Sequence, residues 1–76
     1  MTVELKGKRV LVVGLGKSGL AAVRMLHARG ARVIANDIRP DAEVAEAGEL
    51  RALGVELALG SHDPVLFTGV DRIVRS

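Results

Sequence analysis

The chain has 76 residues, of which 49% are hydrophobic, 26% charged and 1% aromatic, and its formal net charge is +2. This length allows at most one small domain, and a hydrophobic fraction near one half excludes a disordered tail. The absence of cysteine excludes disulfides, cysteine metal sites and thiol nucleophiles. Interleaved charges and a single phenylalanine argue against a nucleic-acid surface, and no apolar run approaches the roughly 20 residues that span a bilayer. We therefore expect a cytoplasmic protein with neither a nucleic-acid nor a membrane partner.

The first half of the chain predicts a strand, a helix and a second strand. Arg9–Val13 is a short apolar run that ends at a glycine, as is typical of a strand buried on both faces of a parallel sheet. Lys17–Arg29 carries apolar side chains at helical spacing, and Gly30 follows where a left-handed cap would end the helix. Arg32–Asn36 predicts a second apolar strand, and Asp37 comes directly after it.

The second half continues the alternation. A second helix is expected over residues 40–53, because Pro40 suits a first turn and apolar residues recur at every third position. Its expected buried face consists of Val44, Ala47, Leu50 and Leu53. Residues 55–59 predict a third strand, a turn and a short helical stretch follow, and residues 71–75 begin a fourth strand. This alternation indicates an α/β fold with a parallel sheet and right-handed crossovers.

Three glycines between the first strand and the first helix form a phosphate-binding pattern. Gly14, Gly16 and Gly19 match G-x-G-x-x-G, in which the glycines allow a tight turn, the approach of a phosphate and close packing of helix on strand. The helix would direct its free N–H groups and its positive dipole end toward a diphosphate. Asp37 is placed to accept a hydrogen bond from a ribose hydroxyl or a base N–H, and its other interpretation is a cap on the segment that follows. The sequence therefore predicts a Rossmann-like nucleotide-binding unit.

Several residues near this motif have two interpretations. Ser18 either contacts a phosphate or caps the helix, and Arg39 either contacts the nucleotide or is a solvated loop residue. The stretch Gly16-Lys17-Ser18 is no Walker A loop, because the glycine required five residues earlier is Leu11.

The two histidines are expected to have no role in catalysis. His27 is predicted to be a surface residue, and a ligand contact by His62 is not favoured, although this residue lies in a turn at the carboxyl edge of the sheet. Their separation suggests no metal site, and no catalytic constellation is visible.

The stretch Val10–Ala22, followed by Asn36-Asp37-Ile38-Arg39, resembles the N-terminal domain of the Mur ligases. Gly60-Ser61-His62-Asp63 and residues 71–76 are also similar, and Ser76 would begin that family's Ser-Pro-Gly turn. The resemblance implies a truncated N-terminal fragment that holds the UDP end of UDP-N-acetylmuramoyl-L-alanine. The longer parent would be an ATP- and Mg-dependent ligase that adds D-glutamate during synthesis of peptidoglycan precursors. Its chemistry would lie in later domains, so the chain alone is expected to be inactive as a ligase.

The resemblance also implies which residues contact UDP. The glycine turn would meet the diphosphate, the residues after the second strand would surround the uracil, and those after the third strand would border the nucleotide. The implied residues are Leu15, Gly16, Ser18, Gly19, Asp37, Ile38, Arg39, Gly60 and Ser61. Ile38 is apolar where the family commonly has a hydroxyl residue, so one polar contact to the base would be missing.

Two other functions fit the same residues. The chain would also serve as the dinucleotide-binding half of an NAD-dependent oxidoreductase, with Asp37 on the adenosine ribose, or as a nucleotide sensor without chemistry. In open α/β sheets the ligand lies where the strand order reverses, which places it between the first and fourth strands. With this crevice only partly formed, we expect millimolar UDP binding, or about −4 kcal/mol.

Overall fold

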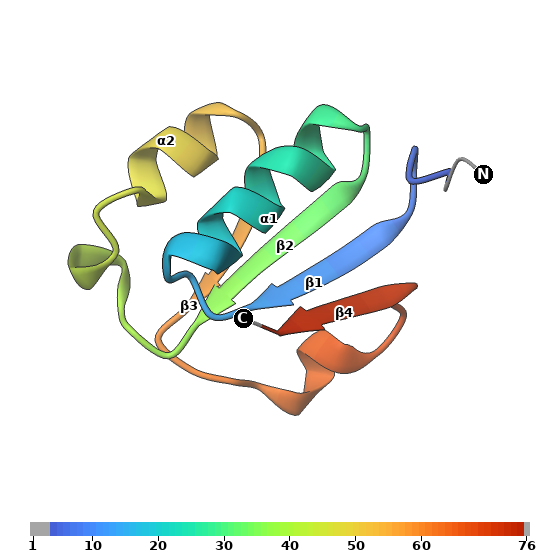
Figure 1. The fold of residues 1–76 in the computed structure, drawn as a ribbon. Helices are drawn as coiled ribbons and strands as arrows, with labels where there is room; N and C mark the ends of the chain where they lie inside the picture. The colour runs from blue at the N-terminus through green and yellow to red at the C-terminus, as the bar shows by residue number, and fades with distance from the viewer. Residues whose placement is uncertain (1–3, 76) are drawn as a thin grey trace.

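The computed structural model describes residues 4–75, which are built around a four-stranded, all-parallel sheet (Figure 1). The strands are β1 (Arg9–Val13), β2 (Arg32–Asp37), β3 (Glu56–Leu59) and β4 (Arg72–Arg75). They lie in the order β3-β2-β1-β4, so the direction of strand addition reverses at β1. This arrangement confirms the α/β, Rossmann-like class, and it places the crevice of such a sheet beside the carboxyl end of β1.

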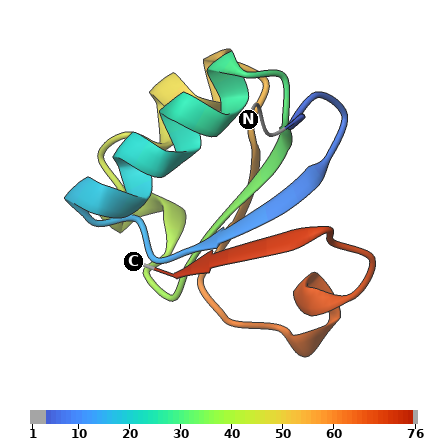
Figure 2. The same cartoon turned by 45° about the vertical axis from the view of Figure 1, so that its right-hand side comes forward.

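The connecting segments lie on both faces of the sheet. The helices α1 (Lys17–Ala28) and α2 (Ala47–Ala52) cover one face, and the short 3-10 helix η2 (Pro64–Phe67) lies on the other (Figure 2). A reversal of strand order moves right-handed crossovers to the opposite face, which accounts for the position of η2. The guanidinium of Arg75 lies 5.7 Å from the centre of the Phe67 ring, so η2 contacts the end of β4.

The core is aliphatic and lies between the sheet and the two α-helices. Alternate side chains of β1 and β2 point to this side, where they meet the buried faces of α1 and α2. The central members are Val10, Val12, Val23, Leu26, Val33, Ala35 and Leu50. Leu11, on the opposite face of β1, has no exposed surface either. Burial on both faces explains why β1 is a continuous apolar run rather than an alternating one.

The expected second helix is interrupted in the structure. Residues Asp41–Glu43 form the 3-10 helix η1, and α2 begins only at Ala47. Between them Val44 has extended backbone angles (φ −107°, ψ 97°), and its side chain is 3% exposed. The prediction of one continuous helix over residues 40–53 was therefore wrong, because the chain leaves the helical path to place Val44 in the core.

The face predicted for that helix was correct except at its end. Val44, Ala47 and Leu50 are buried as expected, whereas Leu53 is 44% exposed because α2 ends at Ala52. Gly30 and Gly54 follow their helices with positive φ angles of 86° and 90°, as left-handed caps require. Ser76 lies outside the described residues.

None of the helices formed by residues 4–75 has the length and apolar character that a membrane crossing requires.

Candidate functional site

The glycine turn connects β1 to α1 at the carboxyl edge of the sheet. Gly14 has a φ of 94°, which favours glycine, and its N–H donates to the carbonyl oxygen of Asn36 at 2.8 Å. Gly16 is the N-cap of α1 and has no side chain to cap the helix. The first backbone bond of the helix runs from Leu20 N to Gly16 O at 2.9 Å. The N–H groups of residues 17–19 therefore precede the helical ladder and are directed toward the edge.

Asp37, the last residue of β2, is bonded to this turn. One carboxylate oxygen accepts a hydrogen bond from the Leu15 N–H at 2.8 Å and another from Arg39 Nη2 at 3.0 Å. The other oxygen accepts from the backbone N–H of Arg39 at 2.9 Å and from its Nε at 3.1 Å. A carboxylate has about four lone-pair positions, so Asp37 uses its full acceptor capacity within the chain.

Arg39 closes a ring of interactions around Leu15. Besides its bonds to Asp37, Arg39 Nη2 donates to the Leu15 carbonyl oxygen at 3.1 Å. Both backbone polar groups of Leu15 are thus engaged, and its side chain is only 2% exposed. The Arg39 side chain remains 42% exposed, so one side of the guanidinium faces solvent at the edge.

These bonds lower the pKa of Asp37 far below its usual range. Side-chain hydrogen bonds from Arg39 contribute most, burial acts in the opposite direction, and the backbone bonds from Arg39 and Leu15 add to the lowering. The same pairing raises the pKa of Arg39. The carboxylate is therefore ionised at neutral pH and holds the turn and the loop after β2 together.

The loop after β3 is bonded to the same edge. The Gly60 N–H donates to the carbonyl oxygens of Asp37 and Arg39, both at 3.0 Å, and Gly60 has a φ of 94°. The side-chain amide of Asn36 donates to the carbonyl oxygens of Ala58 and Ser61, both at 2.8 Å. Three loops, which follow β1, β2 and β3, therefore meet around the end of β2.

All the sequence-predicted site residues lie in these three loops or next to them, in the last residue of β2 and the first turn of α1. Asp37 and Leu15 are buried, Arg39 is half-buried, Gly19 is buried at the start of α1, and the others are exposed. The exposed ones are Gly16, Ser18, Ile38, Gly60 and Ser61. The structure thus brings the predicted set to one edge, while the contacts of these residues with UDP remain predictions.

Asn36 is a site residue that sequence reasoning missed. It was included in the apolar strand, yet its side chain has no exposed surface and joins β2 to the loop after β3. Its carbonyl oxygen also receives the Gly14 N–H. The signal in the sequence was an asparagine inside an otherwise apolar run, where a buried amide requires partners.

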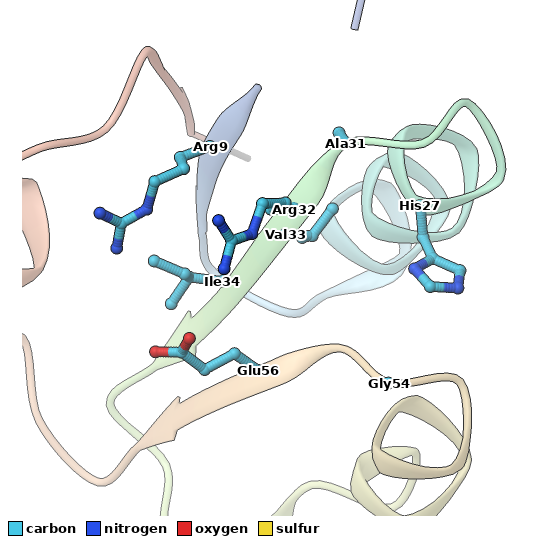
Figure 3. A pocket seen from close by; sticks show the side chains of 8 residues that line it. All are labelled: Arg9, His27, Ala31, Arg32, Val33, Ile34, Gly54 and Glu56. Atoms are coloured by element: carbon cyan, nitrogen blue, oxygen red, sulfur yellow. The ribbon is translucent and has the colours of Figure 1, made fainter. Parts of the chain in front are cut away.

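The hollow shown in Figure 3 lies at the other edge of the sheet. Its volume is about 250 Å³, and it is lined by residues at the amino ends of β1, β2 and β3, including Arg9, Arg32 and Glu56. Because ligands of open parallel sheets bind at the carboxyl ends of the strands, this hollow does not belong to the predicted nucleotide site. Within residues 4–75 there is also no group of three or more potential metal ligands.

The reversed strand order, together with a glycine turn that opens a helix at the carboxyl edge, defines a Rossmann-like domain of the class that places nucleotides at this edge. Comparison with known families identifies the particular group. The chain belongs to the family of Mur ligase MurD-like N-terminal domains, whose family model matches residues 8–76.

The curated relatives are consistent with this family. The chain is 52% identical over 75 residues to the UDP-N-acetylmuramoylalanine–D-glutamate ligase of Anaeromyxobacter dehalogenans and 41% identical over 73 residues to that of Shouchella clausii. Each match covers 96% of this chain and 16% of the relative. The chain thus spans about one sixth of the length of these relatives.

Two solved structures share the fold. Apo D-lactate dehydrogenase from Escherichia coli matches with a TM-score of 0.72 and 37% identity, over 97% of this chain and 21% of that one. The A chain of dipicolinate synthase from Bacillus subtilis matches with a TM-score of 0.79 and 21% identity, over all of this chain and 24% of that one. The second likeness concerns the fold alone.

Proposed function

We propose that this chain is the UDP-binding domain of a longer ligase that adds D-glutamate to UDP-N-acetylmuramoyl-L-alanine in peptidoglycan precursor synthesis. The family membership and the printed names of the relatives support this proposal. The ATP and Mg²⁺ of that reaction are assigned to the remaining domains, because this chain has no Walker A loop. The parent would act in the cytoplasm, and this chain alone would not catalyse ligation.

The observation that carries the proposal is the open space above the glycine turn. A Cβ atom built on Gly16 would meet no heavy atom within 4 Å, and the backbone N–H groups of the following three residues precede the helical ladder. A phosphate oxygen that approaches the backbone at Gly16 would meet no side chain at the Cβ position and would face the positive end of the α1 dipole. We assign these N–H groups and the Ser18 hydroxyl to the diphosphate.

The uracil is assigned to the loop after β2, next to the loop after β3. Ile38 is 62% exposed and offers an apolar surface, and Arg39 presents the solvent side of its guanidinium. Gly60 and Ser61 border the same region through their bonds to β2 and its loop. Asp37 orders Leu15 and Arg39, and a direct bond from the nucleotide to Asp37 would require one of its four present bonds to break.

The test is a UDP titration of the wild-type chain and the Gly16→Val variant. The valine side chain would occupy the space assigned to the diphosphate, so we expect UDP affinity to fall at least tenfold. Gly48→Val is the matched control, because a Cβ at Gly48 in α2 also meets nothing within 4 Å. Equal affinity of the wild type and Gly16→Val would contradict the assignment.

The likeness to D-lactate dehydrogenase keeps one second candidate open, a dinucleotide-binding domain. The same turn and Asp37 would then bind NAD. A parallel titration with NADH separates the two functions, since a UDP-specific site should respond to UDP at concentrations where NADH has no effect.

A further inference from the structure

The exposed His62 is in contact with the buried Asn36. His62 Nδ1 lies 2.6 Å from Asn36 Oδ1. The Asn36 side chain has no exposed surface, whereas His62 is exposed. One side of the imidazole ring is thus fixed to the strand, and the ring nitrogen on the other side, Nε2, has no hydrogen-bond partner among residues 4–75.

The surroundings of Asn36 determine which way round its amide lies. The atom assigned as Nδ2 is 2.8 Å from two carbonyl oxygens, those of Ala58 and Ser61. Carbonyl oxygens only accept hydrogen bonds, so this atom must be the NH2 group, and both of its hydrogens are used. The remaining atom, which faces His62, is therefore the amide oxygen.

This orientation also determines the tautomer of His62. The amide oxygen of Asn36 can only accept, so Nδ1 of His62 must carry the hydrogen. A neutral imidazole has one N–H, and Nε2 is then an unprotonated acceptor. Because Asn36 is completely buried and its partners are fixed, it holds His62 with one acceptor, Nε2, at the edge where the three loops meet.

An acceptor at this position complements the other groups of the site. The carboxylate of Asp37 already accepts four hydrogen bonds, and the Leu15 carbonyl oxygen is bonded to Arg39. The carbonyl oxygens of Asp37 and Arg39 both accept from Gly60, and that of Ser61 accepts from Asn36. Among the groups at this edge, Nε2 of His62 is an acceptor with no competing partner within residues 4–75.

We infer that His62 is a specificity-determining residue, whose Nε2 accepts a hydrogen bond from the imide N–H of a uracil-type base. This inference rests on the proposed function, because it concerns the base of the same nucleotide. A cytosine ring has a lone pair at the corresponding nitrogen, so it would place two acceptors against each other. Asn36 is the positioning residue, since it fixes the tautomer of His62 without contacting the base.

The first test needs no ligand. A long-range proton–nitrogen correlation spectrum at pH 8 reports which imidazole nitrogen of His62 carries the hydrogen. We expect a protonated Nδ1 and an unprotonated Nε2. The opposite tautomer would overturn the inference, because Nε2 would then be a donor.

The second test compares UDP with N3-methyl-UDP, which lacks the imide N–H. One neutral hydrogen bond corresponds to about a three- to tenfold change in affinity, so the wild type should bind the methylated ligand more weakly by that factor.

Two variants of His62 test the role of its Nε2. In His62→Asn, the short side-chain amide can still donate to Asn36, but no atom occupies the position of Nε2. This variant should lose the same factor for UDP and should no longer distinguish the two ligands. In His62→Gln, the longer amide reaches the position of Nε2, so most of the preference for UDP should return.

His27→Asn on α1 controls for the general effect of replacing a histidine, and amide spectra of each variant report whether the fold is intact. If the wild type binds UDP but His62→Asn binds it equally well, the inference is wrong and the proposed function stands. If UDP does not bind the wild type at all, the proposed function fails and this inference fails with it.

Discussion

The carboxylate of Asp37 accepts four hydrogen bonds while it is almost completely buried. Its lowered pKa means that the folded state favours the ionised form. The resulting stability is complete above the unfolded pKa of about 3.9 and is lost as the pH falls through the folded value. In Asp37→Asn this charge is absent, and we expect the free energy of unfolding to fall by about 2–3 kcal/mol at pH 7.

Urea denaturation of both proteins between pH 7 and pH 2 measures this effect. The difference in the free energy of unfolding between the wild type and Asp37→Asn should be constant above about pH 5 and should shrink below about pH 4. Asp63→Asn is the control, since the exposed Asp63 accepts one hydrogen bond, from Val65 N–H, that asparagine can also accept. A difference that does not change with pH would show that the charge of Asp37 does not stabilise the fold.

The first two glycines of the turn should respond differently to alanine. Gly14 has a φ of 94°, where a side chain is strained, so Gly14→Ala should lower the free energy of unfolding by about 1–2 kcal/mol. Gly16 has a φ of −75° and open space at its Cβ position, so Gly16→Ala should cost less than about 1 kcal/mol. Thermal unfolding measures both values. Equal losses would mean that Gly16 also has a structural role, which would weaken its assignment to the phosphate.

For single residues, the sequence allowed predictions at positions that belong to a known motif. It did not do so for a residue whose role depends on its contacts in the folded chain. Gly14, Gly16 and Gly19 were predicted from the spacing of a phosphate-binding turn, and Asp37 from its position after the second strand. Asn36 was missed because its role depends on the carbonyl oxygens of Ala58 and Ser61, which are adjacent only after β3 has paired with β2. No local pattern encodes such a contact.

Of the two α-helices, α2 is attached through fewer buried side chains than α1. It has six residues, of which only Ala47 and Leu50 are buried. Leu50 has no exposed surface, so Leu50→Ala should lower the free energy of unfolding by about 2–4 kcal/mol. Leu53→Ala, at a position that is 44% exposed, should change it by less than about 1 kcal/mol. Urea denaturation of the two variants compares them directly, and similar losses would contradict the observed end of α2.

The elements that were predicted well are those in which local pattern and tertiary packing agree. β1 and α1 were located to within one residue, because a continuous apolar run and a helical period lie on either side of the glycine turn. The second helix was predicted as one element because its apolar residues recur at every third position. Val44 satisfies that period yet has extended backbone angles, so the same burial is achieved without a continuous helix. Periodicity reports which side chains are buried and does not by itself report the backbone path.

For the whole molecule, a chain of 76 residues with an aliphatic core should have limited stability, so ligand binding should be visible as stabilisation. With a dissociation constant of about 1 mM, 10 mM UDP should add about 1.4 kcal/mol and raise the melting temperature by several degrees. Inorganic diphosphate at the same concentration is the control, and it should give a smaller shift because it lacks the base. Equal shifts with the two ligands would indicate a general anion effect.

The full strand order was not predicted from the sequence, although parallel pairing and a reversal between the first and fourth strands were. Alternating strands and helices imply parallel neighbours, but several orders satisfy that rule. The observed order, β3-β2-β1-β4, places the ends of β1 and β2 beside each other and brings the glycine turn to Asp37. The predicted site therefore depends on a feature of the whole sheet that local sequence patterns leave open.

We propose that the carboxyl edge of this sheet binds UDP through the glycine turn and the loop after β2. The most direct measurement is an NMR titration of the isotope-labelled chain with UDP and, separately, with NADH. We predict that UDP shifts the amide signals of residues 15–19 and 37–39, and that NADH at equal concentration does not. Shifts of those amides with NADH alone, or shifts confined to the hollow at the amino ends of the strands, would show that UDP does not bind at this edge.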